Sequence, residues 1–105
     1  MERSNRMDMI LSMLEKEPND IFLNYSLGLE YVANSNFNLA EEQFKKVIQI
    51  QQDYIPAFFH LAKLYEQKNE VMEALKFYKQ GLEFAKKQGN NKAVNELSEA
   101  IFMLE

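Results

Sequence analysis

Few residues in this chain of 105 amino acids could carry out chemistry. His60 is the single histidine, and cysteine is absent. A metal site built from several histidines, a thiolate metal site, a cysteine nucleophile and a disulfide are therefore all excluded. A Ser–His–acid triad at His60 would need partners that the sequence does not supply. We expect no catalytic residue, no metal site and no cofactor, and we predict that the protein is not an enzyme.

The charged residues have a simple structural explanation. Several glutamates fall on predicted solvent-facing sides of helices, close to lysines: Glu15, Glu17, Glu41, Glu42 and Glu83. Pairs such as Glu41 with Lys45 are worth a few tenths of a kcal/mol on a helix surface. The three glycines are isolated, so no glycine-rich phosphate loop is present. A net charge of −4 and two short basic pairs, Lys45-Lys46 and Lys86-Lys87, argue against nucleic-acid binding.

Composition indicates one soluble, helical domain spanning residues 1–105. Hydrophobic residues make up 47% of the chain and charged residues 27%, and a domain of this size can bury roughly 60 to 70% of its unfolded surface. With 3 glycines and 2 prolines, strands joined by tight turns are disfavoured. Residues 1–9 lack the apolar core of a signal peptide, and no apolar run is long enough to span a membrane. We therefore expect a cytoplasmic protein without a membrane partner.

Apolar periodicity and capping residues predict six helices joined by short turns, at about residues 4–17, 21–34, 38–51, 54–68, 71–87 and 91–105. Expected N-caps are Ser4 or Asn5, Asp20, Asp53, and the Asn90-Asn91 pair after Gly89. Pro18 ends the first helix, and Pro56 fits the first turn of the fourth. The helix at 21–34 is apolar on more than one side, so we expect neighbours on more than one side.

The chain repeats itself at a sequence offset of 34, and the repeated positions match in size: Ile21 with Ile55, Leu27 with Leu61, Gly28 with Ala62, Tyr31 with Tyr65, Ala40 with Ala74, Phe44 with Tyr78, and Ile48 with Leu82. The Leu and Tyr lie four positions apart and fill the seam of a helical hairpin. The small residues let the two helices approach closely, and the aromatic side chain fills the remaining space. The pattern therefore predicts two stacked helical hairpins.

These residues resemble the tetratricopeptide repeat, with units at 21–54 and 55–88. The helix at 4–17 resembles the second helix of a preceding unit, and an offset of 36 makes the helix at 91–105 resemble the first helix of a following unit, which caps the stack. The resemblance implies an all-α, right-handed superhelical stack of about six antiparallel helices: half a unit, two full units and half a unit. Asn24 replaces the family's preferred Trp and Gly81 the usual Ala, so looser packing is expected at both.

The resemblance also implies a concave groove that holds peptides, with His60 beside it. Residues carried over to its lining are Phe22, Tyr25, Leu29 and Val32 in the first unit, Phe59 and Lys63 in the second, and Phe102 and Met103 in the last helix. The groove is thus apolar and aromatic at its N-terminal end and more polar at its centre. Of the positions with which the family clamps a carboxylate, only Lys92 agrees, so capture of a C-terminal carboxylate is not expected.

Two functions are compatible with this surface. The first is a protein–protein interaction scaffold that binds an apolar peptide or an amphipathic helix in the concave groove. The alternative is a structural homodimer, or larger homo-oligomer, whose interface is the groove or the C-terminal helix. The aromatic residues would form an exposed patch of at least a few hundred Å², which something must cover. Phe102 and Met103 fit poorly on a terminal helix, whose outer face is usually polar.

Overall fold

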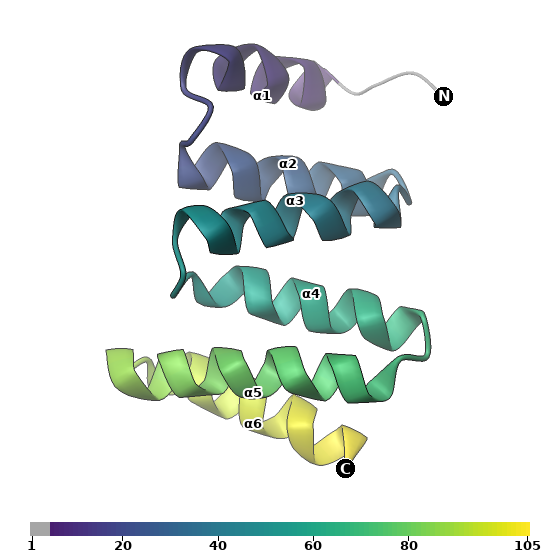
Figure 1. Cartoon of the computed structure of the whole chain (residues 1–105), viewed down its shortest axis with the longest axis vertical. Coiled ribbons are helices and arrows are strands. Elements are labelled where there is room, and N and C mark those ends of the chain that lie inside the picture. The colour runs from purple at the N-terminus through teal and green to yellow at the C-terminus, as the bar shows by residue number, and fades with distance from the viewer. Residues whose placement is uncertain (1–4) are drawn as a thin grey trace. The chain divides into compact units, whose positions relative to one another are not determined.

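The computed structural model describes residues 5–105, which divide into two compact units at residues 5–52 and 53–105. The first unit holds α1 (Asn5–Lys16), α2 (Ile21–Ala33) and α3 (Phe37–Ile50), and the second holds α4 (Ile55–Gln67), α5 (Val71–Gln88) and α6 (Asn91–Leu104). Figure 1 shows that short turns connect successive helices. The described residues contain no strand, so the predicted all-α class is confirmed. The single-domain organisation stays a prediction, and the candidate cap Ser4 lies outside the described residues.

Most of the expected helix ends are confirmed, because the capping side chains make the predicted bonds. The Asp20 carboxylate accepts a hydrogen bond from the Leu23 N–H at 2.8 Å, and the Asn90 side chain accepts one from the Ala93 N–H at 3.1 Å. Gly89 ends α5 with a φ of +66°, the left-handed conformation that glycine adopts without strain. The cap expected at Asp53 is wrong: Tyr54 precedes α4 and makes no side-chain cap bond.

The turns inside the two complete repeats have the same geometry. Ser35 and Asn69, which occupy equivalent positions of the two repeats, both have a φ of +62°. In the first turn the Asn36 N–H donates to the Tyr31 carbonyl at 2.8 Å, and in the second the Glu70 N–H donates to the Tyr65 carbonyl at 2.9 Å. This hydrogen bond ends a helix by satisfying a carbonyl of its last turn. The repeat in the sequence is therefore a repeat in backbone conformation.

The core of the first unit is built from two contacts of α2. Toward α1, Leu27 packs with buried Met7 and Ile10, and Tyr31 lies against the same cluster. Toward α3, Gly28 faces the ring of Phe44, and a methyl group added at Gly28 would lie 2.5 Å from Phe44 Cε1. A helix that must pack on two sides needs two apolar faces, which explains why the sequence of α2 is apolar on more than one side.

The core of the second unit centres on Phe58 of α4. Its ring centroid lies 6.5 Å from that of Phe77 and 5.5 Å from that of Phe84, both on α5. Gly81 makes room for it, since a methyl group added there would lie 3.0 Å from Phe58 Cβ and 3.5 Å from a Leu97 methyl carbon. Gly81 therefore permits a close approach, and the looser packing expected there is wrong.

Asn24 is likewise tightly packed, contrary to expectation. Its side chain is fully buried, and its amide donates to the carbonyls of Pro18 at 3.0 Å and Asp20 at 2.7 Å. The Gln43 amide of α3 in turn donates to Asn24 Oδ1 at 2.7 Å. A buried amide is stable only when its polar atoms are paired. Asn24 thus links the turn before α2 to α3 by hydrogen bonds instead of by a large apolar side chain.

Substituting Gly28 by Ala tests the close contact in the first unit. The added methyl group would overlap the buried Phe44 ring, so we expect a loss of about 1 to 3 kcal/mol in the free energy of unfolding, in spite of alanine's higher helix propensity. Urea denaturation followed by circular dichroism measures it. The matched control is Ser98→Ala, at the equivalent exposed position of α6, which should be neutral or slightly stabilising. Equal stability of Gly28→Ala and the wild type would contradict the contact.

Candidate functional site

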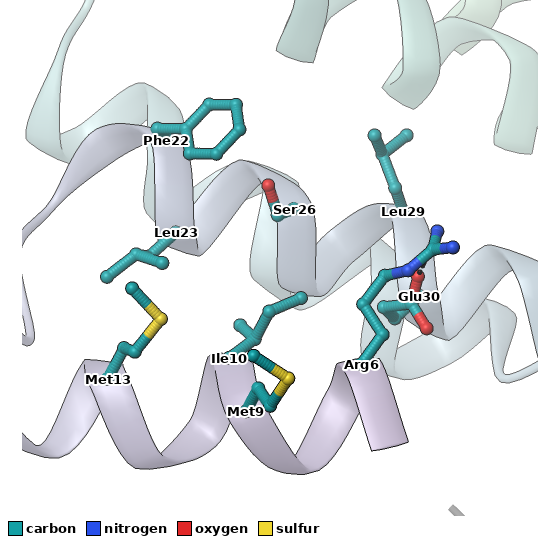
Figure 2. Close-up of a pocket in the computed structure, with 9 residues that line it drawn as sticks. All are labelled: Arg6, Met9, Ile10, Met13, Phe22, Leu23, Ser26, Leu29 and Glu30. Atoms are coloured by element: carbon teal, nitrogen blue, oxygen red, sulfur yellow. Dashed lines mark hydrogen bonds and ion pairs between the residues drawn. The ribbon is translucent and has the colours of Figure 1, made fainter. Parts of the chain in front are cut away.

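An apolar cleft of about 390 Å³ lies between α1 and α2. We call it the α1–α2 cleft; its lining residues are Arg6, Met9, Ile10, Met13, Phe22, Leu23, Ser26, Leu29 and Glu30. Figure 2 shows Met13 of α1 and Leu23 of α2 pointing toward one another across it. Three large apolar side chains on its rim are exposed to solvent: Met9 by 64%, Met13 by 49% and Phe22 by 67%. Apolar groups this exposed and this close together are typical of a binding surface.

The two helices place these side chains through their periodicity. On α1, Met7 and Ile10 point into the core, while Met9 and Met13, four positions apart, form a second apolar row. On α2, the Asp20 cap fixes the start of the helix, so Phe22 lies in its first turn. Methionine is flexible and polarizable, and methionine-rich surfaces adapt to partners of different shape. The chemistry of the cleft is therefore that of apolar contact.

One ion pair closes one end of the α1–α2 cleft. Arg6 Nη1 lies 3.4 Å from Glu30 Oε2, and Figure 2 shows the two side chains side by side. The Arg6 side chain is largely exposed, whereas Glu30 is mostly buried. A buried carboxylate is costly without partners, so Arg6 is held near Glu30 and marks a charged end to an otherwise apolar surface.

A second cleft, of about 430 Å³, lies between α4 and α6 with α5 as its floor. We call it the α4–α6 cleft; it is lined by Phe59, Lys63, Glu66, Tyr78, Glu96, Glu99, Ala100 and Met103. The Lys63 ammonium lies 5.3 Å from the centre of the Phe59 ring, within range of a cation–π contact. Three carboxylates and one ammonium make this cleft polar, in contrast to the α1–α2 cleft.

The surroundings of Tyr78 and His60, near the α4–α6 cleft, shift the pKa values of both side chains. Burial is the main cause that raises the pKa of Tyr78, and the hydrogen bond that its hydroxyl donates to Glu66 is the second. Burial is the main cause that lowers the pKa of His60, and the positive charge of the nearby Lys63 ammonium is the second. His60 is therefore neutral at physiological pH, and its ring lies edge-on to Phe59 with centroids 5.9 Å apart. Within residues 5–105, no group of three or more His, Asp or Glu side chains is arranged to hold a metal ion.

The structure divides the predicted groove residues between the two clefts. Phe22 and Leu29 line the α1–α2 cleft, and Phe59, Lys63 and Met103 line the α4–α6 cleft. Tyr25 is half-buried with its ring 5.9 Å from that of Phe44, so it belongs in part to the core. Val32 is half-buried, and Phe102 is exposed and lines neither cleft. A role for all eight residues in one groove stays a prediction.

The contribution of α1 to the cleft was not predicted from the sequence. Met9, Met13 and Arg6 line the α1–α2 cleft, but none of them was among the predicted site residues. The signal was present, because Met9 and Met13 are large apolar residues outside the buried stripe of their helix. Met13 also corresponds, one repeat further along the chain, to Val47, which is fully buried in α3. When a position is buried in a complete repeat and its equivalent is exposed in a half repeat, the exposed residue lacks the helix that would cover it.

Comparisons with known proteins agree with this architecture. The family model described as tetratricopeptide repeat matches residues 23–54 and 55–88, and the chain therefore belongs to the tetratricopeptide repeat family. No curated protein is matched. None of the helices in the described part of the chain combines the length and apolarity needed to cross a membrane.

Solved structures with the same fold come from several organisms. A tetratricopeptide repeat domain protein from Salinibacter ruber is 33% identical, with a TM-score of 0.79 over 84% of this chain and 89% of that one. The Yersinia enterocolitica secretion chaperone SycD, solved with a peptide of the translocator YopD, is 18% identical, with a TM-score of 0.84 over 93% and 76%. The TPR2B domain of yeast Sti1 in its pHsp70 complex is 14% identical, with a TM-score of 0.84 over 93% and 78%.

The depressed pKa of His60 predicts how stability changes with pH. The unfolded chain binds a proton at His60 more readily than the folded chain does. Stability contributed at this site is therefore present above the ordinary histidine pKa of about 6.5, and it is lost as pH falls from there through the lower pKa of the folded state. Chemical denaturation of the wild type and of His60→Gln at pH 8, 7, 6 and 5 measures this. We expect a smaller loss toward pH 5 in His60→Gln, and parallel curves for the two proteins would contradict the assignment.

Proposed function

We propose that this protein is a protein–protein interaction module that binds an amphipathic helix, or an apolar peptide, in the α1–α2 cleft. The observation that carries the proposal is the cleft itself: Met9, Met13 and Phe22 form an apolar row that is exposed in the described structure, with the Arg6–Glu30 pair at one end. An apolar groove with a charged end matches the way amphipathic helices dock, through anchors spaced along one helical face.

The second unit has an equivalent cleft with one more helix beside it. Equivalent repeat positions lie 68 residues apart in α1 and α5, and 70 residues apart in α2 and α6. By these offsets the two clefts have four equivalent lining positions: Ile10 with Tyr78, Ser26 with Glu96, Leu29 with Glu99, and Glu30 with Ala100. In the second unit, the first helix of the repeat, α4, forms the remaining wall. In the first unit no helix of residues 5–52 stands there. The α1–α2 cleft thus has the shape of a helix-binding site.

Some solved structures with this fold contain a bound protein partner. Two of the solved neighbours are complexes with a partner, a peptide of the translocator YopD for SycD and pHsp70 for the yeast TPR2B domain. At 18% and 14% identity these neighbours support the fold, and the binding role of this chain is our proposal.

The remaining predicted groove residues extend the proposal to a second contact. Val32 is partly accessible, and we propose that it extends the contact made in the α1–α2 cleft of the first unit. Phe59 and Lys63 belong to the second unit, and we propose them as a separate partner contact in the α4–α6 cleft. Tyr25 and Phe59 are also packed, on Phe44 and on Tyr78 with centroids 5.8 Å apart in the second case. Their truncation would therefore destabilise the fold as well as weaken binding, which makes them poor first tests.

Titration of fluorescent model helices with the protein tests the proposal. Sixteen-residue peptides carry one apolar stripe of Val, Leu, Met or Phe on a neutral glutamine background, so that attraction to the net charge of −4 does not contribute. We expect binding by striped peptides and none by scrambled ones. Phe22→Ser and Met13→Ser should each weaken the best binder about five- to thirty-fold, since each removes about 1 to 2 kcal/mol of apolar contact.

The matched control is Met72→Ser, which removes an exposed methionine on α5, outside both clefts. It should bind as the wild type does. Equal weakening by all three variants, or equal binding of scrambled and striped peptides, would contradict a specific site in the α1–α2 cleft.

A further inference from the structure

The last helix, α6, has an uncovered face that corresponds to the face with which α4 holds α5. With the offset of 36 between α4 and α6, Phe58, Ala62 and Glu66 correspond to Val94, Ser98 and Phe102. In α4 the first two are buried and the third bonds to Tyr78 of α5. In α6 Ser98 is exposed, and Phe102 is exposed by 79%. The side of α6 that faces away from α5 therefore occupies the positions with which the first helix of a repeat packs on the second helix, but no second helix is packed there.

The two uncovered faces of the chain are of complementary kinds. Helix α1 corresponds to the second helix of a repeat, and no first helix packs on it within residues 5–52. Helix α6 corresponds to the first helix of a repeat, and no second helix packs on its other side within residues 53–105. We propose that α6 of one copy of this chain docks antiparallel to α1 in the α1–α2 cleft of another copy and so completes a repeat. This inference rests on the proposed function, because it names the helix that the cleft takes.

Side-chain sizes at the proposed joint compensate for one another. In the second unit, large Phe58 faces Gly81, and a methyl group at Gly81 would already be only 3.0 Å from Phe58 Cβ. The equivalent pair at the joint is Val94 with Met13, so the residue from the first helix is smaller and the residue from the second is larger. The two pairs have equal numbers of side-chain heavy atoms, so the smaller residue on the first helix offsets the larger one on the second.

A second pair exchanges a polar contact for an apolar one. In the second unit, the Tyr78 hydroxyl donates a hydrogen bond to the Glu66 carboxylate. The equivalent pair at the joint is Ile10 with Phe102, and Ile10 lines the α1–α2 cleft. Had only one member of the pair changed, the joint would bury an unpaired hydroxyl or carboxylate, which is costly. Both members changed, so the joint is apolar on both sides.

Charges at the two ends also fit an antiparallel arrangement. Helix α1 carries Arg6 and Asp8 in its first turn, and its other end has Lys16 between Glu15 and Glu17, which leaves that end acidic by one charge. Helix α6 begins near Lys92 and is followed by Glu105. Antiparallel docking brings Lys92 to the acidic end of α1 and Glu105 to Arg6. In the single copy Glu105 pairs with Lys79 at 3.0 Å, where both side chains are about half exposed, so Glu105 is open to a second cation.

The proposed joint is heterologous, because it uses a different surface on each copy. Each copy supplies one α6 and one α1–α2 cleft, so association produces a ring if it closes and a chain if it does not. This property separates the proposal from a two-fold symmetric dimer, in which one patch meets its own copy.

Variants with one blocked surface test the joint. Phe102→Glu blocks α6 and Met9→Glu blocks the cleft, and each alters an exposed side chain. In analytical ultracentrifugation at several hundred micromolar, we expect the wild type to exceed the monomer mass of 12.4 kDa and each variant alone to remain near it. Each substitution should weaken association at least about thirty-fold, as expected for a central anchor.

Mixing the two variants gives the decisive result. The Met9→Glu copy retains a normal α6 and the Phe102→Glu copy a normal cleft, so a 1:1 mixture can form one joint, and we expect a dimer and nothing larger. The control Met72→Glu places the same charge on an exposed methionine outside the joint and should associate as the wild type does. Circular dichroism melts establish that each variant is folded.

Three outcomes would overturn the inference: a wild type that stays monomeric at these concentrations, variants that associate as the wild type does, or a mixture that stays monomeric although the wild type associates. A labelled peptide of residues 90–105 separates this result from the proposed function. If that peptide fails to bind while striped model helices still bind in the α1–α2 cleft, the self-association is wrong and the helix-binding function stands. If neither binds, both proposals are wrong.

Discussion

The close contact between an aromatic ring and a glycine holds each complete repeat together. In the first unit the glycine is on the first helix and the ring on the second, as Gly28 faces Phe44. In the second unit a different pair makes such a contact, with the ring on the first helix and the glycine on the second, as Phe58 faces Gly81. What the two units share is a ring packed closely against a glycine, not the positions at which the ring and the glycine occur, because the 34-residue offset pairs Gly28 with Ala62 and Phe58 with Asn24.

Much of the fold could be predicted from the sequence, because its determinants are local. Asp20 and Asn90 as caps, and Pro56 in a first turn, depend on residues near in sequence, and the structure confirms each. Asn24 and Gly81 were misread because each was judged by its own size. Only the hydrogen bonds of Asn24 to its surroundings show that it is fully paired, and only the ring packed against Gly81 shows that a glycine is required there.

The same packing constraint explains why the proposed binding surfaces lie on the first and last described helices and why these surfaces were harder to predict. A helix inside a repeat array buries one face against its own partner and another against the neighbouring unit. In the described residues, α1 contacts α2 but leaves Met9 and Met13 exposed, and α6 contacts α5 but leaves Phe102 exposed. The family pattern named Phe22 and Leu29, which line the α1–α2 cleft, but it assigned nothing to α1, because a complete array covers that face. The exposure of such a side chain depends on which helices pack beside its own helix. A sequence pattern that describes one position at a time carries no information about those neighbours.

The sizes of the facing side chains also affect which helix would fit the α1–α2 cleft. If a helix with the sequence of α4 occupied the α1–α2 cleft, Phe58 would meet Met13 in place of Gly81, and Glu66 would meet Ile10 in place of the Tyr78 hydroxyl. Overpacking and an unpaired buried carboxylate would both oppose that arrangement. A helix with the sequence of α6 meets neither obstacle. Specificity for one helix over another would then arise from the same volume and polarity matching that keeps α4 on α5 within the second unit.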